Sequence, residues 1–460
     1  FPETIALLRG RIPFYMKACH DKYGSIVRVS PNELCFDDAP AWRDIYGSRP
    51  GHANFHKDPI HVGSIASVPG VTTITMADDR NHARQRRALS HAFSTKALLE
   101  QEHIIKGYID VFSKIMKDFA NKGELVNMTD WLAYTTFDII GDLSFGEPFG
   151  CLTKPEFRFW VPLISDSITA GAWEQATRRL ATTDSTLQKL LLKLIPRHIS
   201  DKRKHHLIYS KEKIMKRVKQ TDNDHKDFLY YLMRQKDKDQ LNLDEVIVNG
   251  ALFIIAGTET TAGYLTGLLN NLLRPQNRHV FDKLVQEVRS SFENEDDFTF
   301  EELTKLPYMT AVIEEGHRIF PSAPIGFVRT VPHGGDTVCG EMLPGGTTVS
   351  VCNWAASHSE RNFDKPYDFI PERWLDKENT TDKLHASQAF SLGPRGCIGR
   401  NLSYMEQRLI LAKLVWNNDL ELANHPANDK WNPKNDYENM VVFNNWVKPP
   451  LWVKMMPRNF

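Results

Sequence analysis

The sequence predicts a mainly α-helical protein with a small β-sheet region, folded as one domain over residues 1–460. Three observations carry this prediction: helical periodicity across most of 78–300, a long apolar helix after Asn242, and short strand-like stretches near both ends. The length alone would allow two or three domains. No internal repeat or low-complexity linker divides the chain, which favours a single domain.

Two short strand-like stretches and a long loop are predicted within the first 75 residues. Strand-like stretches at 25–29 and 33–36 are separated by the turn Ser30-Pro31-Asn32. Residues 50–75 are rich in Gly, His and Pro without a clear period, which is typical of a long loop. Helices are then predicted at 81–92, 97–118, 130–143, 183–194, 210–219 and 226–235. The charge runs at 202–206 and 293–297 are predicted to be solvated loops.

The strongest helical pattern begins after Asn242, which is a good N-cap with Glu245 as its capping-box partner. It runs to about Leu273, before Pro275, and about 31 residues would span about 46 Å, enough to cross the whole protein. A further helix is predicted from Pro307 to Pro321. Beyond it, short strands are predicted at 327–331, 336–339 and 347–352.

Residues 390–399 read Phe-Ser-Leu-Gly-Pro-Arg-Gly-Cys-Ile-Gly and place Cys397 directly before an amphipathic helix. A helix N-terminus favours the thiolate, the form of sulfur that binds metals. Glycines at 393, 396 and 399 would let a large flat cofactor approach the backbone, and Arg395 suits a carboxylate on it. The alternative is a buried structural cysteine. A zinc site is disfavoured because the nearest other cysteine is Cys352 and no Cys-x-x-Cys pair exists.

This decapeptide resembles the heme-binding loop of the cytochrome P-450 superfamily, the heme-thiolate monooxygenases. The resemblance implies the family's fold, with heme b between the long central helix and the helix after the cysteine loop. It implies that Cys397 is the axial iron ligand and that Arg395 pairs with a heme propionate. It also implies that Phe390 and Gly399 belong to the cofactor site.

The long helix contains Ala256-Gly257-Thr258-Glu259-Thr260-Thr261, a polar run in an otherwise apolar helix. Thr260 can bond back to the carbonyl of Ala256, which would open the helix and admit water. By resemblance this is the oxygen-activation motif, with Ala256 at the heme, Thr260 beside bound O2 and Glu259 as the acid of a proton relay. The structural alternative is threonine packing between helices.

Glu315 and Arg318 stand three apart on one helix face and can pair. They match the family's Glu-x-x-Arg element, whose third partner would be Arg373 in Pro371-Glu372-Arg373-Trp374. The family form usually ends in Phe rather than Trp. The resemblance implies a buried structural triad that holds the cysteine loop and carries no catalytic chemistry.

Three further residues are expected at the heme propionates. Arg86 and His82 align with a family element that usually reads Trp-x-x-x-Arg, and histidine keeps a ring N–H donor. Arg329 matches a family position whose side chain reaches the heme, and a polar residue after Phe327 and Val328 is otherwise hard to explain. The alternative for the arginine-rich helix at 80–87 is a solvated or partner-facing side.

Equal numbers of basic and acidic residues, 57 of each, give no charge excess that would argue for nucleic acid. Six scattered cysteines favour a reducing compartment. The sequence contains no run of about 18 apolar residues, so no membrane span is predicted within it. The sequence begins at Phe1, and family members commonly carry an N-terminal anchor. An anchor outside this sequence, on the cytosolic face of the endoplasmic reticulum, is therefore expected, and the present residues are expected to be soluble.

The resemblance implies an oxidoreductase that activates O2 and hydroxylates or epoxidises a lipophilic small molecule. The stretch 136–143 looks like filamentous-fungal members, which favours secondary metabolism. Without a Gly-x-Gly-x-x-Gly loop, electrons from NADPH must come through a partner, NADPH–cytochrome P-450 reductase. The predicted apolar pocket lining is Phe55, Phe253, Ile325 and Phe443.

Two alternatives remain open. An oxidative phenol- or ring-coupling enzyme would use the same scaffold without transferring oxygen, and labelled O2 would distinguish it from a hydroxylase. A non-catalytic heme-binding protein would show no turnover with reductase and NADPH, and would be indifferent to Thr260→Ala.

Overall fold

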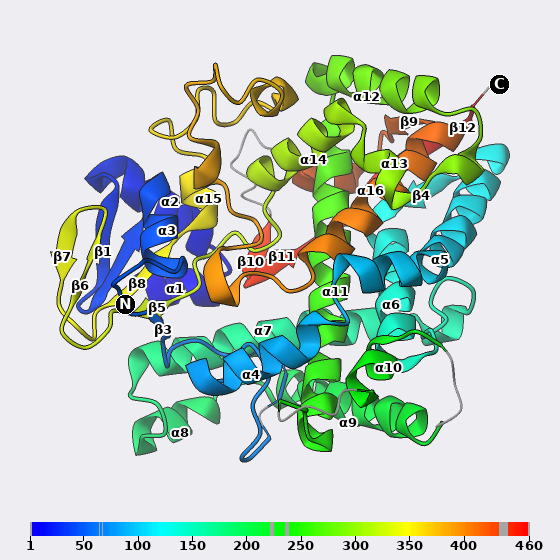
Figure 1. Ribbon diagram of the computed structural model, residues 1–460. Coiled ribbons are helices and arrows are strands. Elements are labelled where there is room, and N and C mark those ends of the chain that lie inside the picture. The colour runs from blue at the N-terminus through cyan, green and yellow to red at the C-terminus, as the bar shows by residue number, and fades with distance from the viewer. Residues whose placement is uncertain are drawn as a thin grey trace.

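The computed structural model describes residues 2–63, 65–66, 68–220, 225–234, 239–431 and 440–458. Helices dominate these ranges, and the strands form small sheets, so the predicted mainly α-helical class is confirmed. Figure 1 shows the largest sheet with α2 (Ile12–Tyr23) and α3 (Ala39–Tyr46) on one side of the molecule, and most helices on the other.

The largest sheet has five strands in the order β1–β2–β8–β5–β3. Their bounds are Ile26–Ser30 (β1), Glu33–Phe36 (β2), Thr348–Val351 (β8), Arg329–Thr330 (β5) and His56–Lys57 (β3). Strands β2 and β8 pair in parallel, and the other neighbours are antiparallel. Strand β3 lies within the predicted loop at 50–75. That prediction was wrong for these two residues because their strand partner lies more than 250 positions away along the chain.

Helix α11 (Leu243–Leu272) runs through the length of the molecule (Figure 1). It begins as predicted: the Asn242 side chain accepts the Glu245 N–H, and the Glu245 carboxylate accepts the Asn242 N–H. Within the described residues it is the one helix long and apolar enough to cross a membrane, but 78% of its apolar window is buried inside the protein. Helix α11 is therefore the core around which the other helices pack.

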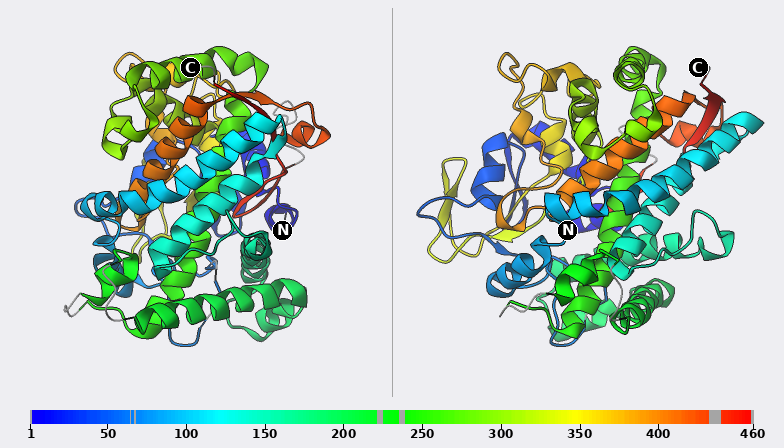
Figure 2. Two further views of the ribbon diagram at one scale, coloured as in Figure 1. Left: turned by 90° about the vertical axis from the view of Figure 1, so that its right-hand side faces the viewer. Right: turned by 45° about the vertical axis from the view of Figure 1, so that its right-hand side comes forward.

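The remaining helices surround α11. Helix α16 (Arg400–Asn417) crosses it, and Figure 2 shows α5 (Thr95–Lys122) lying along α16. The others are α1 (Pro2–Leu8), α4 (Asp79–Ser90), α6 (Met128–Phe145), α7 (Trp160–Leu180), α8 (Thr186–Leu192), α9 (Arg197–Val218), α10 (Phe228–Met233), α12 (Arg278–Ser291), α13 (Phe300–Thr304), α14 (Pro307–Ile319) and α15 (Asn353–Ser357).

Two local predictions differ from the structure. The basic run at 202–206 lies inside α9 and is not a solvated loop, because Arg203 and His206 are buried. Arg203 pairs with Glu174 on α7 at 2.8 Å, and His206 Nε2 lies 2.9 Å from the Ala251 carbonyl on α11. The helix predicted at 183–194 is shorter in the structure, where it corresponds to α8 (Thr186–Leu192). Helix α7 (Trp160–Leu180) was not predicted.

The smaller sheets lie toward the C-terminus. Strand β12 (Trp452–Pro457) pairs with β4 (Leu125–Asn127) and β9 (Asn418–Leu422). Hairpins join β6 (Asp336–Val338) to β7 (Glu341–Leu343), and β10 (Val441–Phe443) to β11 (Asn445–Val447).

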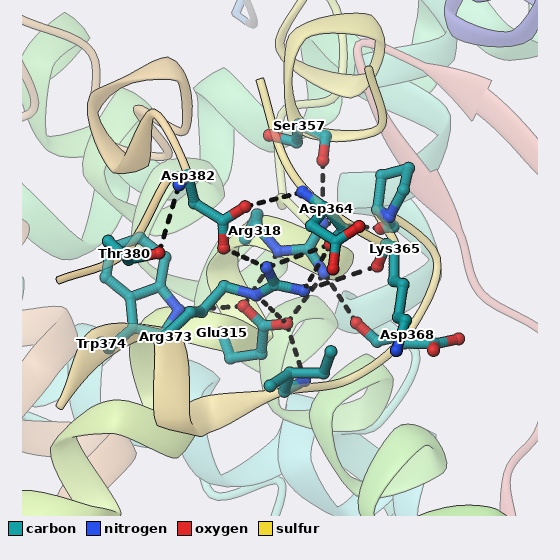
Figure 3. Close-up of polar contacts among 12 residues, drawn as sticks. Glu315, Arg318, Ser357, Asp364, Lys365, Asp368, Arg373, Trp374, Thr380 and Asp382 are labelled. Atoms are coloured by element: carbon teal, nitrogen blue, oxygen red, sulfur yellow. Dashed lines mark hydrogen bonds and ion pairs between the residues drawn. The ribbon is translucent and has the colours of Figure 1, made fainter. Parts of the chain in front are cut away.

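The predicted contacts of Glu315, Arg318 and Arg373 are all present (Figure 3). Arg318 donates to both carboxylate oxygens of Glu315, at 2.8 and 2.9 Å, and neither side chain is exposed. Arg373, on the 3-10 turn Pro371–Trp374, donates to the same carboxylate at 3.2 Å. Trp374 Nε1 adds a bond of 2.9 Å that a phenylalanine at this position could not make.

This network fixes the chain between α15 and the cysteine loop. Besides Glu315, the Arg318 guanidinium donates to the carbonyls of Ser357, Pro366 and Asp368, at 2.8, 2.6 and 2.9 Å. A buried carboxylate and a buried guanidinium are tolerated here because nearly every donor and acceptor has a partner.

Arg318→Ala should lower the free energy of unfolding by about 3–5 kcal/mol, because the Glu315 carboxylate would keep its burial and lose its bidentate partner. The unfolding midpoint and the heme content of purified protein measure this effect. Lys305→Ala is the matched control: Lys305 pairs with Glu302 at the same spacing, but with side chains 60% and 46% exposed. That change should leave the unfolding midpoint nearly unchanged, because a solvent-exposed ion pair contributes little to stability. Equal losses in both variants, or normal heme loading of Arg318→Ala, would contradict the role of the triad.

Candidate functional site

The candidate site lies where α11 passes the loop that precedes α16. The two helices touch through Thr261 Oγ1 and Ser403 Oγ, which are 3.1 Å apart. Most of α11 is buried, yet Ala256 in its middle is exposed and Gly257 and Thr260 are half-buried. Cys397 also has an exposed side chain. Accessible surface on the core helix and on this cysteine gives room for a group between them.

The cysteine loop is shaped by its backbone. The 3-10 turn Gly393–Arg395 leads to Cys397, whose N–H donates to the Phe390 carbonyl at 2.9 Å, and Gly399 is the N-cap of α16. The Phe390 ring packs edge-on against His317, 4.9 Å away between centroids. A Cβ on Gly399 would lie 4.0 Å from Cys397 Sγ, which is an ordinary van der Waals contact.

Gly393 serves a different purpose from the one predicted. Its φ is +69°, and a Cβ there would lie 2.0 Å from the Tyr46 carbonyl oxygen at the end of α3. This glycine therefore allows the loop to pack against α3, and it does not serve the approach of a cofactor.

In the protein without a bound metal, burial works against the expected thiolate of Cys397. Burial raises the pKa of the Cys397 thiol, and it outweighs the opposing effects of the Gly399 backbone, Arg86 and Arg400. The sulfur has accessible surface but lies deep in the molecule, where its charge is poorly solvated. A sulfur-binding metal cation would reverse this balance, because a coordinating thiol is deprotonated.

Thr260 Oγ1 donates to the Ala256 carbonyl at 2.6 Å, the back-bond that the sequence indicated. Ser322 Oγ donates to the Thr260 carbonyl at 2.8 Å. Helix α11 continues unbroken through this point, so the structure does not show the predicted opening of the helix.

Glu259 is buried and lies between three elements. One carboxylate oxygen accepts the Ser165 hydroxyl of α7 at 3.0 Å, and the other pairs with the Lys448 ammonium that follows β11. Sequence reasoning missed both partners because no spacing rule connects residues 165, 259 and 448.

A second acid was also missed. Glu406 on α16 is buried, and burial raises its pKa to about 8 against a hydrogen bond from Thr261. It is therefore mostly protonated at neutral pH, and its partner Thr261 is the residue that follows Thr260 on α11. The apolar residues Leu402 and Leu409, four before and three after Glu406 on the same helix face, were a signal of its burial.

Basic side chains surround the loop on the side of α4. Arg86 donates to the Gly396 carbonyl, and Arg395 donates to the Ala77 carbonyl at 2.8 Å and pairs with Asp79 at 2.9 Å. Arg329 on β5 is 4% exposed, and burial lowers its pKa to about 10. The structure thus places Arg86, Arg329 and Arg395 around one region, as predicted.

His82 is a neutral member of this region. It is buried, and its pKa falls to about 4, first because of burial and then because of Arg395 and Arg86. A neutral imidazole can donate one ring N–H, which is the property expected of it.

The chemistry of these donors fits a dianionic cofactor. Within the described part of the chain, Nη1 of Arg329 and Nη1 of Arg395 are buried without a hydrogen-bond partner. An unsatisfied buried donor costs about 1–3 kcal/mol, more when it is charged. Two such groups, one of them on the cysteine loop, suit the carboxylates of heme b.

Three of the four predicted pocket residues, Phe253, Ile325 and Phe443, belong to or pack against the main hydrophobic core. Phe55 belongs to the separate core on the sheet side. The Phe253 ring packs against Phe93 and Phe228, with centroids 5.2 and 5.9 Å away. Ile325 borders a cavity, and Phe443 is half-buried on β10.

Comparison with known proteins agrees with this geometry. The family model described as Cytochrome P450 matches residues 4–444. The cytochrome P450 monooxygenase aba2 of Botryotinia fuckeliana is 42% identical, over 99% of this chain and 88% of its own length. The ABA2 monooxygenase of Pyricularia oryzae is 42% identical with the same coverage, and astJ of Aspergillus oryzae is 41% identical over 98% and 88%. This chain therefore belongs to the cytochrome P450 family of heme-dependent monooxygenases.

Proposed function

We propose that this protein hydroxylates or epoxidises a lipophilic small molecule in fungal secondary metabolism, with Cys397 as the thiolate ligand of heme b. The observation that carries the proposal is the accessible Cys397 sulfur just before α16, together with the buried Nη1 atoms of Arg329 and Arg395 that lack acceptors. The relatives named above are fungal monooxygenases. Electrons would come from NADPH–cytochrome P450 reductase.

Each residue would have a defined role. Heme b, when bound, supplies oxygen activation, and a thiolate ligand favours cleavage of the O–O bond. Cys397 would provide that thiolate, and Arg86, Arg329 and Arg395 would hold the carboxylates of the cofactor. Ala256, with only a methyl group, leaves room over the face of the ring.

We assign proton delivery to Thr260 and Glu259. The Thr260 hydroxyl is half-buried and anchored to the Ala256 carbonyl, so its oxygen can accept a proton from water and pass one on. The Glu259 carboxylate contacts the Ser165 hydroxyl and the Lys448 ammonium, which provide a polar path from α7 and β11. This path supports a relay that approaches Thr260 from the α7 side.

The organisation of the chain supports one catalytic domain, because a single main core includes residues from Ala6 to Met455.

We also propose attachment to the endoplasmic reticulum, facing the cytosol. On and after α8, Leu187, Leu190 and Leu194 are 56%, 54% and 71% exposed. A cluster of exposed leucines suits a lipid surface.

A carbon-monoxide difference spectrum of the reduced protein tests the ligand. The wild-type protein should give the spectrum of thiolate-ligated heme, and Cys397→Ser should lose it while other ligation remains detectable. Cys339→Ser is the matched control and should keep the signature, because Cys339 lies on the β6–β7 turn. A thiolate signature in Cys397→Ser would refute the assignment.

Thr260→Ala should lower product formation per NADPH consumed by about 10²-fold, the low end of what a positioned proton donor contributes. Thr266→Ala removes a back-bond of the same kind, 2.7 Å to the Ala262 carbonyl, farther along α11. This control should leave coupling unchanged. The relay is contradicted if Thr260→Ala stays fully coupled and active.

A further inference from the structure

Lys448 is a buried cation that none of the motifs found in the sequence includes. It directly follows β11, which lies against α11 (Figure 1). The Lys448 side chain is 7% exposed, and it pairs with the Glu259 side chain, which is 3% exposed. Removing two charges from water costs about as much as their attraction returns, so stability alone does not account for such a pair.

The backbone on both sides of Lys448 is anchored to other elements. The Trp446 Nε1–H donates to the Pro321 carbonyl at 2.8 Å, just beyond α14. The Pro449 carbonyl accepts the Thr129 hydroxyl of α6 at 2.9 Å. The starting point of the Lys448 side chain is therefore fixed relative to the helices that surround the candidate site.

Helix α11 leaves room for this side chain. Gly263 stands four residues after Glu259, so the two positions share one face of the helix. A Cβ on Gly263 would lie 3.3 Å from Lys448 Cδ and would crowd it. The glycine thus lets the lysine stem lie along α11 with its ammonium at the Glu259 carboxylate.

The Glu259 carboxylate faces away from Thr260. Its second oxygen accepts the hydroxyl of Ser165, a half-buried residue of α7, at 3.0 Å. The Thr260 hydroxyl is bonded instead to the Ala256 carbonyl at 2.6 Å. Successive side chains on an α-helix point about 100° apart, so Glu259 and Thr260 lie on different sides of α11. A proton therefore passes between them only through a further group such as water, and the position of the carboxylate decides where that group must lie.

The other carboxylate near Lys448 belongs to Asp130 on α6. Its side chain accepts the Asn127 amide at 2.7 Å. Burial raises the pKa of Asp130, and Lys448 opposes this less than Asn127 and Arg158 do. Among the ion pairs of the described residues, Lys448 pairs with Glu259 alone. Its main electrostatic partner is therefore the acid of the proposed relay.

We propose that Lys448 is a positioning residue for this relay: it holds the Glu259 carboxylate on the α7 side of α11, against Ser165. The inference rests on the proposed function and adds to it a residue from the chain after β11. Without the ammonium, Glu259 would be a buried charge with no counter-charge, and its place beside Ser165 would no longer be favoured. Lys448 itself would act only through Glu259.

The test measures product formed per NADPH consumed. Lys448→Met keeps a long side chain without the charge and should lower this ratio about 10-fold, less than the loss of a proton donor itself. Lys448→Arg keeps the cation and should restore most of the ratio. Lys413→Met is the matched control, because Lys413 on α16 is 5% exposed and pairs with Asp110 at 2.9 Å. That variant should keep the wild-type ratio.

Ser165→Ala tests the same route without removing a charge. It should lower the ratio about 3- to 10-fold, the factor that corresponds to one hydrogen bond. In the background of Glu259→Gln, adding Lys448→Met should cause no further loss, because effects that pass through one group are not additive.

Turnover driven by hydrogen peroxide separates positioning from folding. Peroxide brings oxygen that is already reduced and protonated, so it bypasses proton delivery. Lys448→Met should therefore keep the wild-type rate with peroxide while its NADPH-driven ratio falls.

An unchanged ratio in Lys448→Met or in Ser165→Ala would overturn the inference. So would an equal loss of peroxide-driven turnover in Lys448→Met, or independent losses in the double variant with Glu259→Gln. The single variant Glu259→Gln keeps this distinct from the proposed function. If it stays fully coupled, the relay itself is refuted, whereas an uncoupled Glu259→Gln beside a coupled Lys448→Met refutes only the role of Lys448.

Discussion

The burial of charge around the loop before α16 is the constraint on which the rest of this structure depends. On one side, Glu315 receives Arg318 and Arg373, and Asp382 pairs with Arg373, so two cations face two anions. The charges on that side are balanced. Arg318 also holds the segment between α15 and the loop through hydrogen bonds to the backbone carbonyls of Ser357 and Asp368. On the other side, the buried Nη1 atoms of Arg329 and Arg395 have no hydrogen-bond partner among the described residues.

This asymmetry separates a structural element from a binding site. A buried ion pair whose lone pairs and N–H groups are all used can hold the chain in one position. Buried donors without acceptors lower stability until a ligand completes them. The protein therefore carries on the α4 side an electrostatic cost that a dianionic cofactor would remove, and cofactor binding would be coupled to stability.

Helix α11 shows a similar division along its length. Its N-terminus is a locally complete capping box, and most of its side chains are packed in the core. Only near Ala256 and Thr260 does it present accessible surface and polar groups. Two acids lie near this stretch in different surroundings: Glu259 pairs with Lys448, whereas burial raises the pKa of Glu406 to about 8.

Local patterns in the sequence determined much of this protein. The capping box at Asn242, the Glu315–Arg318 pair and the Thr260 back-bond all connect residues three or four apart, and helical geometry brings such residues together. The decapeptide around Cys397 likewise indicated the family. Only the tertiary structure decided the register of Lys57 on Arg329, the pairing of Glu259 with Lys448, and the packing of Gly393 on Tyr46. These contacts join segments between 189 and 347 residues apart, where no periodicity operates and where the solvation of each charge depends on what the whole fold places around it.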